Sequence, residues 1–491
     1  MQFIKERFNY LFKSTKGLIL VAIAMIGLET ALFGMLSGPM AEFGVRDFVV
    51  RLFKMDLVQA EREGRIIILY HSIAMAAVAI ETYMITGLLK MNEFYKTTVR
   101  LLITIGYLMA MIFGMGFAYW GHNWALHGLY IVGLTLIFFA GVLLTIALWP
   151  WNKEYYQPDK AYARTKKGVD MERVAFFATA LTTVISALFG AIPGSFYGNG
   201  FETFMAQDII RLPEKTTMEY SIIGHLHIML ALIAIMITLI IGRWLNFKGI
   251  LQKIAMPLII LGTIVLNLGV WGVATPLEPV AHMIIYVGAT PAMLGALMLV
   301  IFTWDKLIRE GVAGIQKPNG WQKLKALLRD PLRFGPMWQM VFMNFTTSFI
   351  GIFMAVRLEE IFRVWPAHEE RIELTGHWHV LSAIVATIIL LYYGDMIDLK
   401  GKLRKIYGWS IIILSDIAFG AVTIFEMKRL FITEANQQPL VNTLMLLMDF
   451  GLGMLLVVLA MVMVWRLLDL SKKKGRWTEE VEHELSAEVN Q

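Results

Sequence analysis

The chain has 491 residues, of which 57% are hydrophobic and 17% are charged. This composition excludes a soluble globular protein and is typical of an integral membrane protein. The absence of cysteine excludes disulfides, thiolate metal sites, iron–sulfur clusters and covalently attached c-type heme. The formal net charge of +6 comes from basic residues in short segments between apolar runs, so it indicates membrane topology rather than nucleic-acid binding.

Apolar segments of about 20 residues, the length that crosses a bilayer core, recur along the chain. They predict twelve transmembrane helices near residues 17–38, 67–90, 98–120, 125–149, 172–192, 219–243, 253–273, 281–303, 336–356, 375–394, 407–427 and 441–467. The loops after the even-numbered helices and both termini are basic, which indicates the cytoplasmic side. We therefore expect one transmembrane domain over residues 1–470 and a short cytoplasmic tail over 471–491, in a multi-pass protein of the plasma (inner) membrane.

Seven of the ten histidines lie near the outer ends of the even-numbered helices. They are His71 in helix 2, His127 in helix 4, His225 and His227 in helix 6, His282 in helix 8, and His377 and His379 in helix 10. Their distances from the outer helix ends correspond to a depth of roughly 5–18 Å. A single histidine at a helix end is commonly an interfacial residue, but seven in one layer of the membrane indicate a shared purpose.

The spacing of these histidines predicts an internal repeat. His71, His225 and His377 follow one another at 154 and 152 residues, and His127 and His282 are 155 residues apart. Similar short segments, "ETALFG" (29–34), "SALFG" (186–190) and "TSFIG" (347–351), each lie in the helix before a histidine-bearing helix. We therefore expect an all-α fold of three tandem four-helix units, approximately 17–150, 172–303 and 336–467, around a pseudo-threefold axis along the membrane normal.

Two of the helices carry histidines at positions i and i+2. In "GHWH" (376–379), residues His377 and His379 are about 200° apart around the helix, so they point to opposite sides. Heme iron binds an imidazole at its axial position, and a histidine inside a bilayer is otherwise costly. One such helix can therefore serve two hemes, and "GHLH" (224–227) repeats the arrangement.

These motifs and the twelve-helix pattern resemble the heme-copper oxidase superfamily, which comprises the catalytic subunits of respiratory oxidases and nitric oxide reductases. The resemblance covers the whole chain in architecture, and "GHWHV" and "GHLHIM" carry its specific part. It implies that His71 and His379 are the axial ligands of a low-spin heme and that His377 is the proximal ligand of a second heme. It also implies that Lys428 and Arg429, after helix 11, neutralise the heme propionates, which need cationic partners.

The chain departs from the family at the second metal. The family's helix 7 carries adjacent histidines, whereas this helix ends in "LNLGVWGVATPLEP" (266–279) without any. Met229 stands four residues after His225, where the family has a tyrosine or a glutamate. Three to four ligands are the usual minimum for such a metal. Copper is therefore doubtful, and we do not expect oxygen or nitric oxide reduction in the family's usual manner.

Three arrangements remain open for the other histidines. His225 could bind the second heme opposite His377 and make it a bis-histidine electron carrier. Alternatively, Glu278 and His282, at i and i+4, could join His225 or His227 in a non-heme metal site. A third heme held by His227 together with His127 or His282 is also geometrically open.

Four acidic residues are predicted to lie deep in the membrane spans. They are Glu29 in helix 1, Glu81 in helix 2, Asp416 in helix 11 and Asp449 in helix 12. Buried carboxyl groups in a bilayer mark proton or ion routes, or they pair with polar neighbours and hold helices together. We favour proton or quinone chemistry for these residues, with structural pairing as the alternative.

The combined expectation is a membrane oxidoreductase subunit with two b-type hemes that moves electrons between an outer-face cytochrome or other redox subunit and membrane quinone. Without cysteine the chain has no electron-entry centre of its own, so we expect it to belong to a multisubunit complex. The outer loops 39–66, 193–218 and 357–374 are long enough to dock a partner. The alternatives are a divergent terminal oxidase or nitric oxide reductase and, from another class, a transporter with structural histidines.

Overall fold

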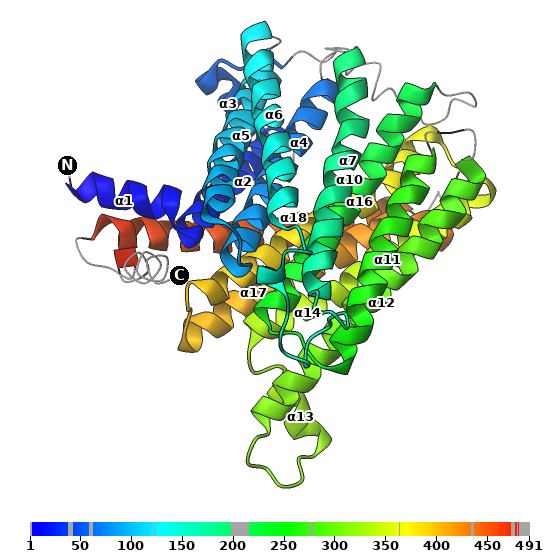
Figure 1. Ribbon diagram of the computed structural model, residues 1–491. Coiled ribbons are helices and arrows are strands. Elements are labelled where there is room, and N and C mark those ends of the chain that lie inside the picture. Colours follow the sequence, from blue (N-terminus) through cyan, green and yellow to red (C-terminus); the bar gives the residue numbers. More distant parts are fainter. Residues whose placement is uncertain are drawn as a thin grey trace. The chain divides into compact units, whose positions relative to one another are not determined.

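The computed structural model describes residues 2–37, 43–57, 62–121, 123–197, 216–273, 275, 278–362, 364–433, 437–472, 477–478 and 480. These residues form helices, apart from connecting turns and one isolated antiparallel bridge between Arg164 and Asp170. The long helices are α2 (Thr15–Ser37), α4 (Arg62–Leu88), α5 (Glu93–Trp120), α6 (Trp124–Ala147), α7 (Met171–Tyr197), α10 (Thr217–Trp244), α11 (Ile250–Val273), α12 (Glu278–Gly311), α16 (Ala367–Met396), α17 (Gly401–Met427) and α18 (Gln437–Ser471) (Figure 1).

Ten helices among the described residues are long and apolar enough to cross a membrane. They contain the segments Thr15–Leu36, His71–Leu88, Glu93–Trp120, Trp124–Ala147, Met171–Pro193, Ile250–Val273, Val280–Gly311, His379–Met396, Gly401–Leu430 and Gln437–Ser471. Each coincides with one of the predicted spans. The chain is thus a multi-pass helical membrane protein, as its composition predicts.

The other two predicted spans are also helical. The range 219–243 lies within the continuous helix α10. The range 336–356 is divided among α14 (Pro331–Phe342), the π-helical turn η4 (Met343–Ser348) and α15 (Phe349–Val356). A π-helical turn shifts the hydrogen-bond register by one residue, so this segment is not one uniform α-helix.

Shorter helices connect or flank the long ones. They are α1 (Gln2–Lys13), α3 (Val45–Phe53), η3 (Lys153–Tyr155), α13 (Gly320–Leu327), η5 (Leu358–Phe362) and η6 (Lys428–Leu430). The chain divides into two compact units, each of which is described by itself. Unit 1 comprises Met1–Leu89, Lys96–Ala140 and Leu452–Gln491, and unit 2 comprises Lys90–Tyr95 and Gly141–Gly451.

Glycines allow adjacent helices to pack with their backbones in contact. In unit 1, a Cβ added at Gly106 of α5 would lie 2.9 Å from the carbonyl oxygen of Gly133 in α6. In unit 2, a Cβ at Gly262 of α11 would lie 2.8 Å from the carbonyl oxygen of Gly288 in α12. The two α5–α6 glycines precede their α11–α12 counterparts by 156 and 155 residues. These two helical hairpins are therefore built alike, at a spacing close to that of the histidines.

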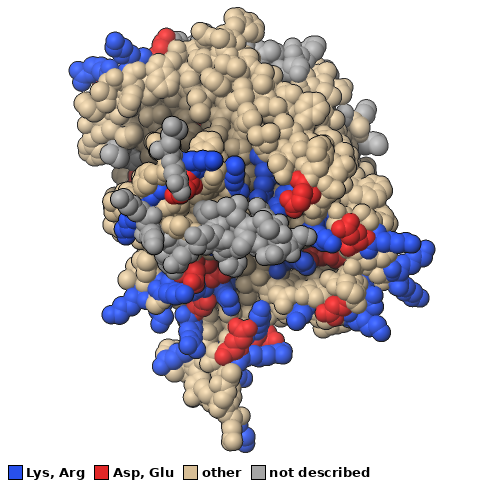
Figure 2. Space-filling model, turned by 60° about the vertical axis from the view of Figure 1, so that its left-hand side comes forward, with Lys and Arg blue, Asp and Glu red and all other residues tan. Residues whose placement is uncertain are grey.

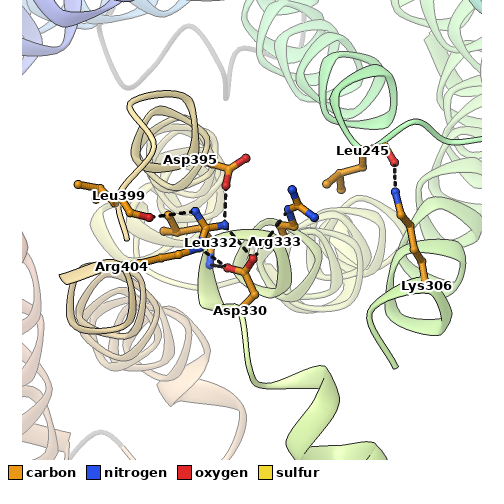
Figure 3. Close-up of polar contacts among 8 residues, drawn as sticks. All are labelled: Leu245, Lys306, Asp330, Leu332, Arg333, Asp395, Leu399 and Arg404. Carbon is orange, nitrogen blue, oxygen red and sulfur yellow. Dashed lines mark hydrogen bonds and ion pairs between the residues drawn. The ribbon is translucent and has the colours of Figure 1, made fainter. Parts of the chain in front are cut away.

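Unit 2 contains a network of ion pairs at the ends of three helices. Arg404 of α17 donates hydrogen bonds to both carboxylate oxygens of Asp330, at 2.9 and 2.8 Å, and to Asp395 near the end of α16 (Figure 3). Asp330 is also the N-cap of α14 and accepts from the backbone N–H of Leu332. Figure 2 shows Lys and Arg side chains gathered over the lower part of the face that it draws.

Unit 1 has a corresponding arrangement with hydroxyl partners. Arg100 of α5 donates hydrogen bonds to the hydroxyl oxygens of Thr15, at the start of α2, and Thr86, near the end of α4, at 2.8 and 3.0 Å. A third arginine, Arg243 at the end of α10 in unit 2, forms an ion pair with Glu172 at the start of α7, with a nitrogen–oxygen distance of 3.1 Å. An arginine thus ties helix ends together in each of the three predicted four-helix segments.

Candidate histidine site

His225 is the predicted site residue with the best-defined surroundings. It lies in the first half of α10, within "GHLH", and its side chain is half-buried against α7. Its Nδ1 atom is 3.1 Å from the carbonyl oxygen of Ser186. Because a carbonyl oxygen can only accept, Nδ1 carries the proton and the lone pair is on Nε2. This is the tautomer in which Nε2 can bind a metal.

The residue that makes room for this imidazole is Gly190. An added Cβ at position 190 would lie 2.7 Å from three atoms of the His225 ring, Cε1, Nδ1 and Nε2. Gly190 follows Ser186 by one helical turn, and both belong to the segment "SALFG". One short segment of α7 therefore supplies both the hydrogen-bond acceptor and the space for the ring.

The hydroxyl group of Ser186 connects this segment to α11. Trp271 Nε1 donates to Ser186 Oγ at 3.0 Å, and Ser186 Oγ donates to Asn267 Oδ1, also at 3.0 Å. Asn267 in turn donates to the carbonyl oxygen of Thr263 at 2.7 Å, and its side chain is fully buried. Trp271 and Asn267 belong to the segment 266–279, which contains no histidine. Here these two side chains are engaged in hydrogen bonds within the protein.

A metal site of three side chains is not found among the described residues: no group of three His, Asp or Glu lies close enough to hold an ion. The alternative site predicted from His227, Glu278 and His282 is only partly described. His282 is half-buried in α12, whereas the side chains of His227 and Glu278 lie outside the described part of the structure. That site stays a prediction.

The predicted heme ligands of helices 2 and 10 lie in different units. His71 is half-buried in α4 of unit 1. His379 is exposed in α16 of unit 2, and His377 is in the same helix, with its side chain outside the described part. Their joint ligation of hemes stays a prediction.

His127, the other candidate for a third heme, is packed among aromatic rings in unit 1. Its side chain is buried in α6, and its ring stacks on Trp124 with centroids 6.0 Å apart. The ring of Phe117 lies 5.3 Å away. These contacts are those of a packed aromatic cluster, and the third heme likewise stays a prediction.

The basic pair after α17 lies close to the "GHWH" segment. A side chain at Gly376 would overlap the carboxyl group of Glu426, so α16 and the end of α17 are in contact there. Lys428, two residues further on, is only 4% exposed, and its ammonium lies 4.4 Å from the ring centroid of Phe425. Arg429 is half-buried. The pair is therefore packed against the protein rather than held in a solvated loop.

The two acidic residues of unit 1 are deeply buried. Glu29 in α2 is 0% exposed and Glu81 in α4 is 4% exposed. Among the described residues, neither carboxyl oxygen of Glu29 has a hydrogen-bond partner. Oε1 of Glu81 has none among them either. Burial of this kind is costly in a membrane helix and is typical of functional positions.

The two acidic residues of unit 2 differ from them. Asp416 of α17 accepts a hydrogen bond from Trp338 Nε1 of α14 at 2.8 Å and a longer one from Gln339 Nε2 at 3.5 Å. Asp449 is exposed on α18. Asp416 therefore links two helices, which is the structural alternative for these residues.

Comparisons with protein-family models, with curated proteins and with solved structures found no match to this chain. Sequence reasoning missed the roles of Ser186, Gly190, Asn267 and Trp271. The segment "SALFG" was noticeable as a repeated motif, but only the packing of α7 against α10 reveals that its serine and glycine surround an imidazole.

Proposed function

We propose that the chain is a heme-b-bearing membrane subunit of an oxidoreductase complex, with the twelve helices of a heme-copper oxidase-like fold. It would move electrons between an outer-face redox partner and membrane quinone. The observation that carries this proposal is the orientation of His225. Its Nδ1–H is held by a backbone carbonyl in the interior of a membrane protein, which is how metal-binding histidines are fixed.

His225 and His377, which both belong to unit 2, are the residues that would hold one heme. A b-type heme bound there would supply reversible one-electron transfer. The chain's own residues orient the ligand: the Ser186 carbonyl selects the tautomer, and Gly190 leaves space for the ring. The buried cation of Lys428 near "GHWH" provides a partner for a propionate.

The repeated helix contacts support the proposed arrangement of four-helix units. The glycine contacts of α5–α6 and α11–α12 recur after 155 to 156 residues, and His71 and His225 are 154 residues apart. Two independent features, backbone packing and histidine position, therefore share one period. A tandem duplication of a four-helix unit accounts for both.

The first test is the absorption spectrum and metal content of the purified protein. We expect a Soret band and the α-bands of bis-histidine b-type hemes, no stoichiometric copper, and negligible oxygen consumption with quinol or reduced cytochrome. The absence of a Soret band would contradict the proposal and favour a transporter. A wild-type heme that binds carbon monoxide would instead favour a terminal reductase.

A matched pair of glycine variants tests the proposed ligand. In Gly190→Ala the new methyl group displaces the His225 ring, so we expect one heme to become high-spin and to bind carbon monoxide, as in His225→Ala. Gly34→Ala is the control, because Gly34 holds the corresponding position of "ETALFG" and an added Cβ there meets no described atom within 4 Å. An unchanged heme spectrum in both Gly190→Ala and His225→Ala would exclude His225 as a ligand.

A further inference from the structure

The N-terminal helix α1 is joined to the first span by one residue. α1 ends at Lys13, α2 begins at Thr15, and the intervening Ser14 accepts a hydrogen bond from the backbone N–H of Gly17 at 3.0 Å. A side chain at Gly17 would overlap the carbonyl oxygen of Tyr10, so glycine permits a close approach of the two helices at this corner. α1 consequently runs across the end of α2 (Figure 1).

The inner face of α1 is polar and is held by the C-terminal end of the chain, within unit 1. Tyr10 is fully buried and donates a hydrogen bond to Glu480 Oε2 at 2.8 Å. Arg466, only 1% exposed, donates to the same carboxylate at 2.9 Å. The guanidinium of Arg7 lies 4.2 Å from the ring centroid of Trp477. These contacts fix which side of α1 faces outward.

The outer face of α1 is apolar. Phe3, Ile4 and Phe8 are 44%, 71% and 57% exposed, respectively. Lys5 and Lys13 are exposed beside them. A helix on a water-facing surface has the opposite arrangement, with apolar side chains inside and charged ones outside. The outer face of α1 is therefore unsuited to water.

We propose that this outer face lies in the boundary between lipid headgroups and acyl chains and that Lys5 and Lys13 bind anionic headgroups. The corner at Ser14 places α1 directly at the end of the span α2, which is the level of this boundary. Apolar side chains flanked by lysines match the chemistry of that layer. This inference is independent of the heme-binding function.

Site-directed spin labelling tests the proposal, because a chain without cysteine accepts a single label at a chosen residue. Ile4→Cys and Phe8→Cys are labelled in the full chain and reconstituted into bilayers of zwitterionic lipid with or without phosphatidylglycerol. Gln316→Cys, an exposed polar position in the connection between α12 and α13, is the control. We expect labels at 4 and 8 to lie roughly 5–10 Å below the headgroup level, more accessible to oxygen than to a nickel chelate.

Three outcomes decide the proposal. Phosphatidylglycerol should deepen the labels at 4 and 8, and Lys5→Gln with Lys13→Gln should abolish that increase. Labels as accessible to nickel as the one at 316 would place the outer face in water and overturn the proposal. Labels protected from both reagents would show that a protein covers α1, which would also overturn it. Both labelled positions are exposed, so either variant alone is sufficient.

Discussion

The two compact units hold the ends of their helices together with the same residue type but different partners. In unit 1, Arg100 of α5 bonds two threonine hydroxyls, whereas in unit 2 Arg404 of α17 bonds two aspartates. The two arginines are 304 residues apart, twice the 152-residue spacing of His225 and His377. Each arginine bonds to the start of one helix and to the end of a later one. The hydrogen bonds of Arg100 described above go to hydroxyl groups, and those of Arg404 go to carboxylates.

The difference in chemistry has an energetic consequence. Arg404 and Asp330 form two parallel hydrogen bonds, an arrangement that is strong and directional. If the arginine is lost, however, two partly buried carboxylates remain, with the side chain of Asp395 only 14% exposed. Loss of Arg100 leaves two hydroxyl groups, which are less costly to bury. The charged connection is thus the more sensitive one to removal of its arginine.

The largest expected effect is that of Arg404→Gln. Removing one partner of a buried ion pair leaves uncompensated charge, so we expect the free energy of unfolding to fall by about 3 kcal/mol. Denaturant titration in detergent micelles measures this change. Arg333→Gln is the control, because Arg333 lies 3.8 Å from Asp330 and its side chain is 41% exposed; that variant should lose less than about 1 kcal/mol.

Arg100→Gln is expected to have about half that effect. The charge-assisted hydrogen bonds to Thr15 and Thr86 are lost, so we expect a decrease of about 1.5 kcal/mol in the free energy of unfolding. The same titration on both arginine variants gives the comparison directly. Equal losses in the two units would show that the aspartates contribute no more than the hydroxyl groups.

The helices could largely be predicted from the sequence, because hydropathy identifies the apolar segments that are long enough to cross a membrane. In the described part of the chain, all twelve predicted ranges fall on helical structure, and ten of the helices are long and apolar enough to cross a membrane. The π-helical turn at Met343–Ser348 was not predicted, since it changes the hydrogen-bond register without changing the hydrophobic pattern. The corner at Gly17 was missed because a glycine at a helix start has no distinctive sequence context.

The candidate site could be predicted only in part. Histidine is rare and costly in a membrane, so its positions were informative, and they led to His225. Threonine, serine and asparagine are common in membrane helices, so the roles of Thr86, Ser186 and Asn267 had no comparable signal. The segment 471–491 was predicted to be a short cytoplasmic tail, but its contact with α1 through Trp477 depends on cation–π and aromatic contacts that hydropathy does not measure.

The smallest expected effect is that of Thr86→Val, which tests whether the Thr86 hydroxyl stabilises the protein through its hydrogen bond with Arg100. Thr86→Val removes one hydrogen-bond partner of Arg100, so we expect a loss of about 1 kcal/mol in the free energy of unfolding. Thr82 is the matched control: it lies one turn earlier in α4 and is also buried, but its hydroxyl donates to the carbonyl oxygen of Val78 in the same helix. Such a bond within a helix contributes little to stability. Thr82→Val should therefore be close to neutral in the same titration, and equal losses in both variants would show that Thr86 contributes through packing rather than through Arg100.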